Sequence, residues 1–148
     1  CAASMLCNIP ARYEFETKLI EQRKERALSV KELKSTMNDA WKLWYGNSLT
    51  EMDDMIWASK LHFSISGLGF YNYPYLFGYL FSLGIYAEKD SYDGDFNELY
   101  LKILRDTGSM NAVDLINNHL GKSIEEKDFW LSSIAIVDKS VTRFENLL

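Results

Sequence analysis

Residues 29–46, SVKELKSTMNDAWKLWYG, contain the start, the body and the end of one α-helix. Ser29 and Glu32 form a capping-box pattern, in which the two side chains satisfy N–H groups at the start of a helix. Gly46 is typical of the position after the last turn. Between them, apolar residues recur at helical spacing: Leu33, Met37, Ala40, Trp41 and Trp44. The stretch therefore predicts a complete amphipathic helix.

Similar helical signals occur along the rest of the chain, and no segment has a β pattern. Pro10 is expected to kink or start the first helix, and Ser123 to Glu126 is expected to be a second capping box. In the last helix, apolar residues recur at steps of three and four, which predicts one apolar face: Trp130, Ile134, Val137, Val141 and Phe144. Helices are expected over about 2–27, 29–45, 71–88, 96–106, 111–120 and 126–147, with a short helix or extended piece over 54–62. We predict an all-α fold of six or seven helices.

Composition limits the classes of function. The chain has 148 residues, which suits one domain or a piece of a larger one. The net charge is -5 and there is no basic run, so we expect no binding to nucleic acid. The 25 residues from Phe63 to Ala87 lack charged side chains. Glycines and tyrosines are spread through this segment, so we expect a loop and a buried helix rather than a membrane span.

The two cysteines and the start of the chain bear on its origin. Cys1 and Cys7 have a spacing that fits neither a disulfide framework nor a zinc site. We expect unpaired thiols in a reducing compartment, and hence a cytoplasmic protein. The chain does not begin with methionine and has no basic segment before an apolar one. We therefore expect no signal peptide, and expect a fragment of a longer protein.

One histidine precedes a set of regularly spaced tyrosines. His62 is followed by a loop with Gly67 and Gly69, and then by Tyr71, Tyr75 and Tyr79. Phenols four residues apart lie along one face of a helix. Together with an imidazole, they could donate hydrogen bonds to an oxyanion. The alternative is a core histidine beside a helix whose aromatic residues only pack.

Other catalytic motifs are missing from the sequence. There is no HExxH, GxGxxG, P-loop or GxSxG pattern, so we expect no metal ligands in this segment. His119, the second histidine, is expected to be exposed near the C-terminus of a helix, where its charged form suits the helix dipole.

Several stretches form a pattern that covers nearly the whole chain: residues 8–16 (NIPARYEFE), 45–46 (YG), 57–63 (WASKLHF), 70–82 (FYNYPYLFGYLFS), 108–109 (GS), 113–116 (VDLI) and Gly121. In this order they resemble the oligoendopeptidase F family, zinc metallopeptidases related to thimet oligopeptidase. The most specific part is the block that contains the histidine, the loop and the tyrosines.

The resemblance implies a large helical protein with a deep cleft that cleaves short peptides. In that family an HExxH helix and a later glutamate bind zinc, and the glutamate of the motif is the general base. Residues 1–148 would be a single helical segment at the C-terminal end of the catalytic domain, downstream of the zinc motif. Zinc would then belong to the full-length enzyme, and this segment alone would bind none and cleave nothing. Its partners would be short peptides and the rest of the peptidase chain, with no membrane or nucleic acid.

The resemblance also assigns roles to single residues. His62 matches the family histidine that faces the zinc, Tyr71 the first loop tyrosine, and Tyr79 a later tyrosine on the helix. These three are expected to stabilise the oxyanion. Tyr75 is a third candidate, and Tyr73 competes for either tyrosine role. Tyr73, Tyr75, Gly67 and Gly69 are expected to bind substrate.

Two further hypotheses stay open at this point. The chain could be a stand-alone helical module that binds peptides without catalysis, or a helical domain whose aromatic stripe is only core. A piece of a larger cleft protein should also expose aromatic surface, so we expect self-association at high concentration.

Overall fold

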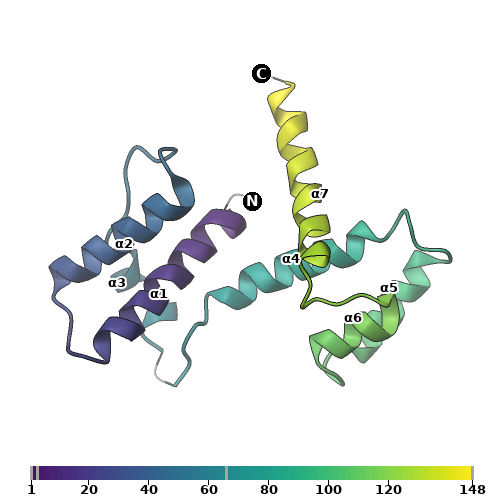
Figure 1. Cartoon of the computed structure of the whole chain (residues 1–148), viewed down its shortest axis with the longest axis horizontal. Helices are drawn as coiled ribbons and strands as arrows, with labels where there is room; N and C mark the ends of the chain where they lie inside the picture. Colours follow the sequence, from purple (N-terminus) through teal and green to yellow (C-terminus); the bar gives the residue numbers. More distant parts are fainter. Residues whose placement is uncertain (1, 3, 66, 148) are drawn as a thin grey trace. The chain divides into compact units, whose positions relative to one another are not determined.

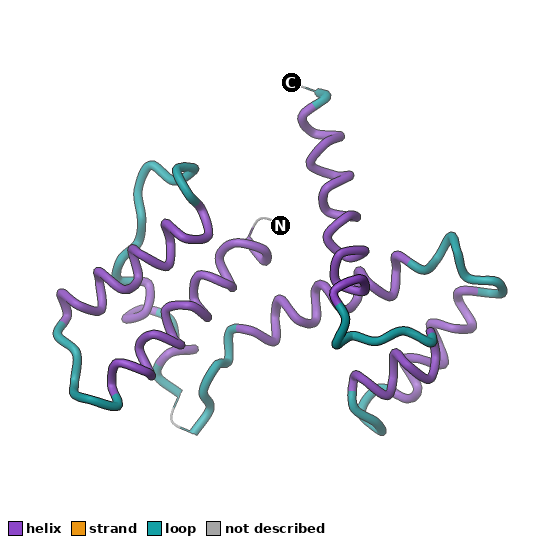
Figure 2. Tube along the Cα trace, viewed as in Figure 1, coloured by secondary structure: helices purple, strands orange, loops and turns teal. Residues whose placement is uncertain are grey.

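The computed structural model describes residues 2, 4–65 and 67–147, and all regular elements among them are helices (Figures 1 and 2). The predicted all-α fold is therefore confirmed, with seven α-helices in this part of the chain. Cys7 is a free cysteine, whereas Cys1 lies outside the described residues. The elements are a π-helix η1 (Ser4–Asn8), α1 (Ile9–Arg23), α2 (Val30–Tyr45), α3 (Ile56–Ser59), a 3-10 helix η2 (Leu61–Phe63), α4 (Tyr73–Ala87), α5 (Phe96–Asp106), α6 (Ala112–Leu120) and α7 (Lys127–Glu145).

The helix expected from residues 29–46 is confirmed at both ends. The Glu32 N–H donates to the Ser29 hydroxyl at 3.3 Å, and the Ser29 N–H donates to the Glu32 carboxylate at 2.8 Å. At the other end, Gly46 has a φ of 55°, a conformation that L side chains rarely adopt. The first helix begins rather than kinks near Pro10, which lies in the first turn of α1. This helix ends at Arg23, not near residue 27.

The second predicted capping box does not form. The Ser123 hydroxyl accepts from the N–H of Glu125 at 3.2 Å, and Glu126 precedes α7 without a side-chain cap. The physical reason is the burial of Ile124, whose carbonyl accepts from the Trp130 indole at 2.7 Å. This contact holds residues 123–126 in a turn, so the serine is too far from the helix start to cap it.

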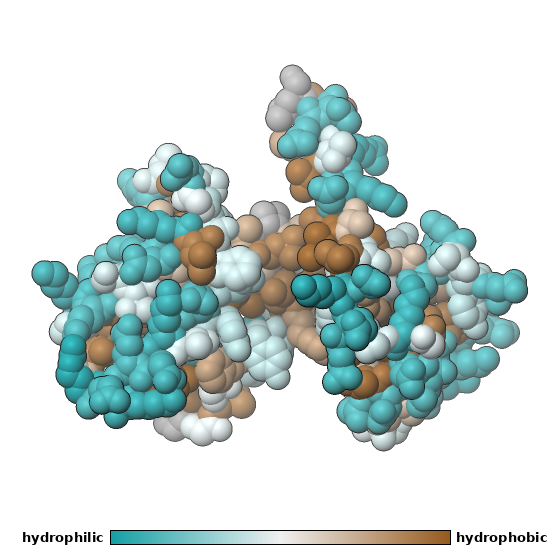
Figure 3. Space-filling model, in the orientation of Figure 1, coloured by the Kyte–Doolittle hydropathy of each residue, from teal (hydrophilic) through white to brown (hydrophobic). Residues whose placement is uncertain are grey.

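The buried face of α7 also differs from the predicted one. Phe129, Ser133 and Val137 are buried, whereas Ile134 and Phe144 are 41% and 60% exposed. The face is decided by the Phe129 ring, which packs on α4 so closely that any Cβ at Gly84 would overlap it. The expected apolar stripe therefore leaves its C-terminal part uncovered, and Figure 3 shows hydrophobic surface along this helix.

The chain divides into two compact units, residues 1–78 and 79–148, which we call the N-terminal and C-terminal units. The boundary falls within α4. In the N-terminal unit, α1 and α2 pack side by side (Figure 1) over a core of Ala11, Phe15, Met37, Ala40, Trp41 and Ile56. The C-terminal unit has a core of Ile85, Leu99, Ile103, Leu115, Ile116, Ile124 and Phe129.

Two further expectations can be compared with the fold. None of the helices in the described residues is both long and apolar enough to cross a bilayer. The prediction that His119 is exposed was wrong, although it does lie in the last turn of α6. Its side chain is only 14% exposed, and its Nε2 lies 2.7 Å from the Asp106 carboxylate. Helix spacing could not reveal this partner, because Asp106 comes from the end of α5.

Candidate functional site

His62, Tyr71 and Tyr75 meet in the N-terminal unit, and we call them the donor cluster. The His62 Nε2 and the Tyr75 hydroxyl are joined by a hydrogen bond of 3.1 Å. The Tyr71 ring stacks on the imidazole at 5.4 Å between centroids, and the two tyrosine rings meet edge to face at 6.0 Å. Three of the residues named from the sequence are therefore brought together.

The donor cluster lies outside the hydrophobic core of its unit. Tyr71 and Tyr75 are 38% and 42% exposed, so the hypothesis that the aromatic stripe is only core does not describe them. His62 is half-buried, and its Nδ1 is buried without a hydrogen-bond partner in the described part of the chain. The two tyrosines of the cluster are therefore partly exposed to solvent, whereas the imidazole is half-buried and contacts both.

The backbone on each side explains how the cluster forms. His62 lies in η2, where the ring of the next residue, Phe63, packs edge to face against the fully buried Phe15 at 5.4 Å. Tyr71 lies in a turn and Tyr75 in the first turn of α4. The expected helical spacing therefore holds from Tyr75 onward, but Tyr71 reaches His62 from outside the helix.

The glycine-containing loop runs beside the histidine. A cavity of about 280 Å³ is lined by His62 and by both Gly67 and Gly69, as well as by Glu16 and Arg23. Gly67 has a φ of 79°, which explains why this position needs glycine. The loop therefore lies beside His62, and its role in binding substrate stays a prediction.

A buried carboxylate from α1 holds the turn that carries Tyr71. Glu16 is 5% exposed, and accepts from the N–H of Phe70 at 2.6 Å and from the Asn72 amide at 3.3 Å. Glu16 was not among the candidate residues predicted from the sequence. A signal was available, because Glu16 interrupts the apolar series Ile9, Tyr13 and Ile20 at steps of three and four residues.

Arg12 is a cation that interacts electrostatically with Tyr75 of the donor cluster. Burial lowers the pKa of its guanidinium, while the neighbouring Tyr45 and Tyr75 act in the opposite direction. Its Nε is buried without a hydrogen-bond partner among the described residues. The site therefore combines phenols with a positive charge, an arrangement that favours bound groups with negative or partial negative charge.

The environment of Tyr75 favours the neutral, protonated form of its phenol. Loss of solvent around the hydroxyl raises the pKa of Tyr75, and the neighbouring Tyr71 phenol raises it further, whereas Arg12 lowers it. The phenol therefore keeps its proton at neutral pH and can donate it in a hydrogen bond.

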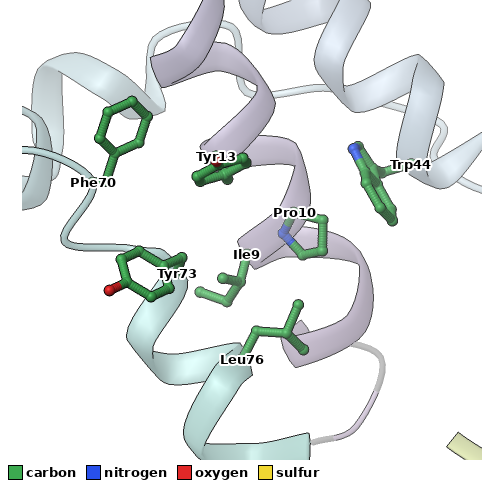
Figure 4. Close-up of a pocket in the computed structure, with 7 residues that line it drawn as sticks. All are labelled: Ile9, Pro10, Tyr13, Trp44, Phe70, Tyr73 and Leu76. Carbon is green, nitrogen blue, oxygen red and sulfur yellow. The ribbon is translucent and has the colours of Figure 1, made fainter. Parts of the chain in front are cut away.

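Tyr73 takes part in a different feature, an apolar pocket of about 470 Å³ (Figure 4). The pocket is open to solvent, and Figure 4 shows side chains from α1, α2 and α4 around it. Phe70, which precedes Tyr71, contacts the Tyr13 ring at 5.4 Å. The lining residues are Ile9, Pro10, Tyr13, Trp44, Phe70, Tyr73 and Leu76. Residues 70–76 thus contribute to the pocket and to the donor cluster.

Tyr79 follows Tyr75 by one turn of α4 and is the first residue of the C-terminal unit. Tyr79 is therefore not one of the three residues of the donor cluster. The role of Tyr79 in stabilising an oxyanion stays a prediction. Within the described residues, no group of three or more His, Cys, Asp or Glu side chains could hold a metal ion.

Comparisons with protein-family models, with characterised proteins and with solved structures found no match to this chain. The resemblance to the oligoendopeptidase F family therefore depends on the sequence motifs alone.

Proposed function

We propose that this chain is the C-terminal helical segment of a zinc metalloendopeptidase of the oligoendopeptidase F type, which hydrolyses short peptides. In this proposal the segment supplies groups that bind the substrate backbone and stabilise the oxyanion. The supporting observation is the convergence of His62, Tyr71 and Tyr75, with a hydrogen bond of 3.1 Å between imidazole and phenol. The zinc ligands and the general base would come from upstream sequence and the rest of the peptidase chain.

The chemistry of the cluster fits peptide hydrolysis. The upstream motif would hold the zinc, which would supply polarisation of the scissile carbonyl and a lowered pKa of the attacking water. The phenol of Tyr75 donates to the carbonyl oxygen as negative charge develops on it, and the imidazole orients that phenol. Donors fixed in advance stabilise the transition state more than the substrate, so they raise kcat. Tyr71 and Tyr79 are the further candidates for this contact.

The length of the native protein is the first test. We expect the intact mass of the protein purified from its source to be several times 17.2 kDa, with an HExxH motif upstream. A native mass near 17.2 kDa would overturn the proposal that the segment belongs to a peptidase.

A kinetic test follows in the full-length enzyme. Removing one oxyanion donor costs on the order of 3 kcal/mol in the transition state, so Tyr75→Phe should lower kcat by about 100-fold or more with little change in KM. His62→Ala should act in the same direction. Tyr100→Phe is the matched control, because Tyr100 is similarly exposed but stacks on Phe96 in the C-terminal unit. Unchanged turnover in Tyr75→Phe and His62→Ala would reject the catalytic role.

The second candidate function is a stand-alone peptide-binding module. The open apolar pocket beside the donor cluster favours it, because peptide sites combine apolar surface with a few polar groups. The isolated chain should then bind a labelled pool of unstructured octapeptides, and Tyr73→Ala should weaken this binding. Binding without hydrolysis by the native protein would favour the module over the peptidase.

A further inference from the structure

The turn over residues 70–72 is held from both sides of Tyr71 by one side chain. Oε1 of Glu16 accepts from the N–H of Phe70 at 2.6 Å, and Oε2 accepts from the Asn72 amide at 3.3 Å. Glu16 and Asn72 are 5% and 0% exposed. Tyr71 is therefore bracketed by two contacts with the same buried carboxylate, which comes from α1.

This turn is costly to form without the carboxylate. Phe70 has a φ of 57°, a left-handed conformation that costs about 1–3 kcal/mol for a bulky residue unless its surroundings enforce it. The Asn72 side chain is buried with its Oδ1 unpartnered among the described residues. Burying such groups is unfavourable, so the two hydrogen bonds that Glu16 accepts are what keep the turn in this conformation.

The position of Tyr71 depends directly on that turn. Its ring stacks on His62 at 5.4 Å with an interplanar angle of 28°, and also meets the ring of Tyr75. Because Tyr71 precedes α4, no helical hydrogen bond fixes its backbone. A change of φ at Phe70 would turn the tyrosine away from the imidazole.

We propose that Glu16 is a positioning residue, which fixes the 70–72 turn so that Tyr71 stays stacked on His62 and the donor cluster is ready to bind a peptide. This inference extends the proposed function, and its relation to ligand binding depends on that function. A carboxylate that only stabilises the fold would affect the melting temperature alone. A positioning carboxylate also controls the environment of the His62 ring and the affinity for peptide.

The test uses Glu16→Gln in the 148-residue chain. Glutamine keeps the size but removes the charge, so both contacts lose the strength of a charge-assisted hydrogen bond. The second contact also forms only if the Asn72 amide turns its Oδ1 toward the glutamine NH₂. Glu14→Gln is the matched control, since Glu14 lies on the same helix, paired with Lys18 at 3.1 Å. The double variant Glu16→Gln/Asn72→Asp reverses the donor and the acceptor, and should restore both contacts. If Glu16→Gln does not fold, Asn72→Ala replaces it, because it removes one contact and keeps the Phe70 bond.

Two readouts separate positioning from stability. The first is the NMR shift of the His62 ring protons, assigned with His62→Ala, which reports the stacked Tyr71 ring. The second is the affinity for a fluorescent pool of unstructured octapeptides. Glu16→Gln should move the His62 resonances and weaken binding by about tenfold, equal to about 1.4 kcal/mol. The double variant should return both readouts most of the way to the wild-type values, and Glu14→Gln should change neither.

The outcomes distinguish this inference from the proposed function. Unmoved His62 resonances in a folded Glu16→Gln chain with a lower melting temperature would overturn the positioning role. Moved resonances that the double variant does not restore would overturn the assigned pair of contacts. If the wild-type chain binds no peptide but Glu16→Gln moves the His62 resonances, the positioning role stands and peptide binding by this segment is rejected.

Discussion

The two units differ in whether their buried polar side-chain atoms have hydrogen-bond partners. In the N-terminal unit, Arg12 Nε, His62 Nδ1 and Asn72 Oδ1 are buried without hydrogen-bond partners among the described residues. The same unit holds Phe70 in a left-handed conformation. These atoms and this backbone all lie beside the donor cluster or in the turn that forms it.

The C-terminal unit follows the local rules of helical proteins. No buried side-chain polar atom among its described residues is unpartnered. The Asp95 and Asn111 side chains cap the starts of α5 and α6, and Gly121 ends α6 in the left-handed conformation. Violations of such rules concentrate at functional sites, because binding needs groups that the fold leaves unsatisfied. The contrast therefore supports placing the site in the N-terminal unit and a framework role in the C-terminal unit.

The largest expected effect on stability comes from removing a large side chain from the core of the C-terminal unit. Phe129→Ala should lower the free energy of unfolding by about 3–5 kcal/mol, because a large buried ring is lost and a cavity remains. Urea unfolding followed by circular dichroism measures the change. Tyr73→Phe, at a side chain that is 51% exposed, should stay within about 0.5 kcal/mol of wild type. Equal losses of unfolding free energy in Phe129→Ala and Tyr73→Phe would contradict the distinction between a structural C-terminal unit and a binding site in the N-terminal unit.

A second pair of variants tests the close packing on α4. Gly84→Ala should destabilise by about 1–3 kcal/mol, because the added methyl overlaps the Phe129 ring in a filled core. Gly78→Ala, on the same helix with nothing within 4 Å, should stabilise by up to about 1 kcal/mol through helix propensity. Thermal unfolding of both variants gives the comparison. A stabilised Gly84→Ala would show that the ring can move aside.

The two predicted capping boxes provide a smaller test. Ser29→Ala removes a formed capping box and should cost about 1 kcal/mol. Ser123→Ala removes only a turn contact to the Glu125 N–H, so it should change stability by less than about 0.5 kcal/mol. Parallel urea titrations measure both. The opposite order would mean that the second capping box forms in solution.

The smallest effect is a shift in titration at the donor cluster. The pKa of Tyr75 is raised above the ordinary value of 10.0. A raised pKa in the folded state means that its contribution to stability is present below the unfolded pKa and is lost as the pH rises through the folded one. The difference in phenolate absorbance between wild type and Tyr75→Phe should therefore rise at a higher pH than the absorbance of free tyrosine. A difference titration at or below the ordinary pKa would contradict the assigned environment.

The regular elements could be predicted from the sequence because their signals are local. The capping box at Ser29, the glycines after α2 and α6, and the cap at Asp95 each act within one turn. The second capping box failed because a tertiary contact, from the Trp130 indole to the Ile124 carbonyl, decided the conformation instead.

The site could be predicted only in part. His62, Tyr71 and Tyr75 were candidates from the sequence, and these side chains do meet. Glu16 could not be identified as their support, because its contacts to Phe70 and Asn72 join residues 54 and 56 positions apart. Such contacts depend on how the chain folds back on α1, which no local pattern specifies.

The uncovered end of α7 has a consequence for the motion of the backbone. Every residue over 138–147 is exposed, although the helix continues to Glu145. A helical segment of this length without packing is marginal in water. Its amide hydrogens should therefore exchange with deuterium far faster than those near Val137, which is buried. Slower exchange at high protein concentration would show that a second copy covers Val141 and Phe144, as the expected self-association requires.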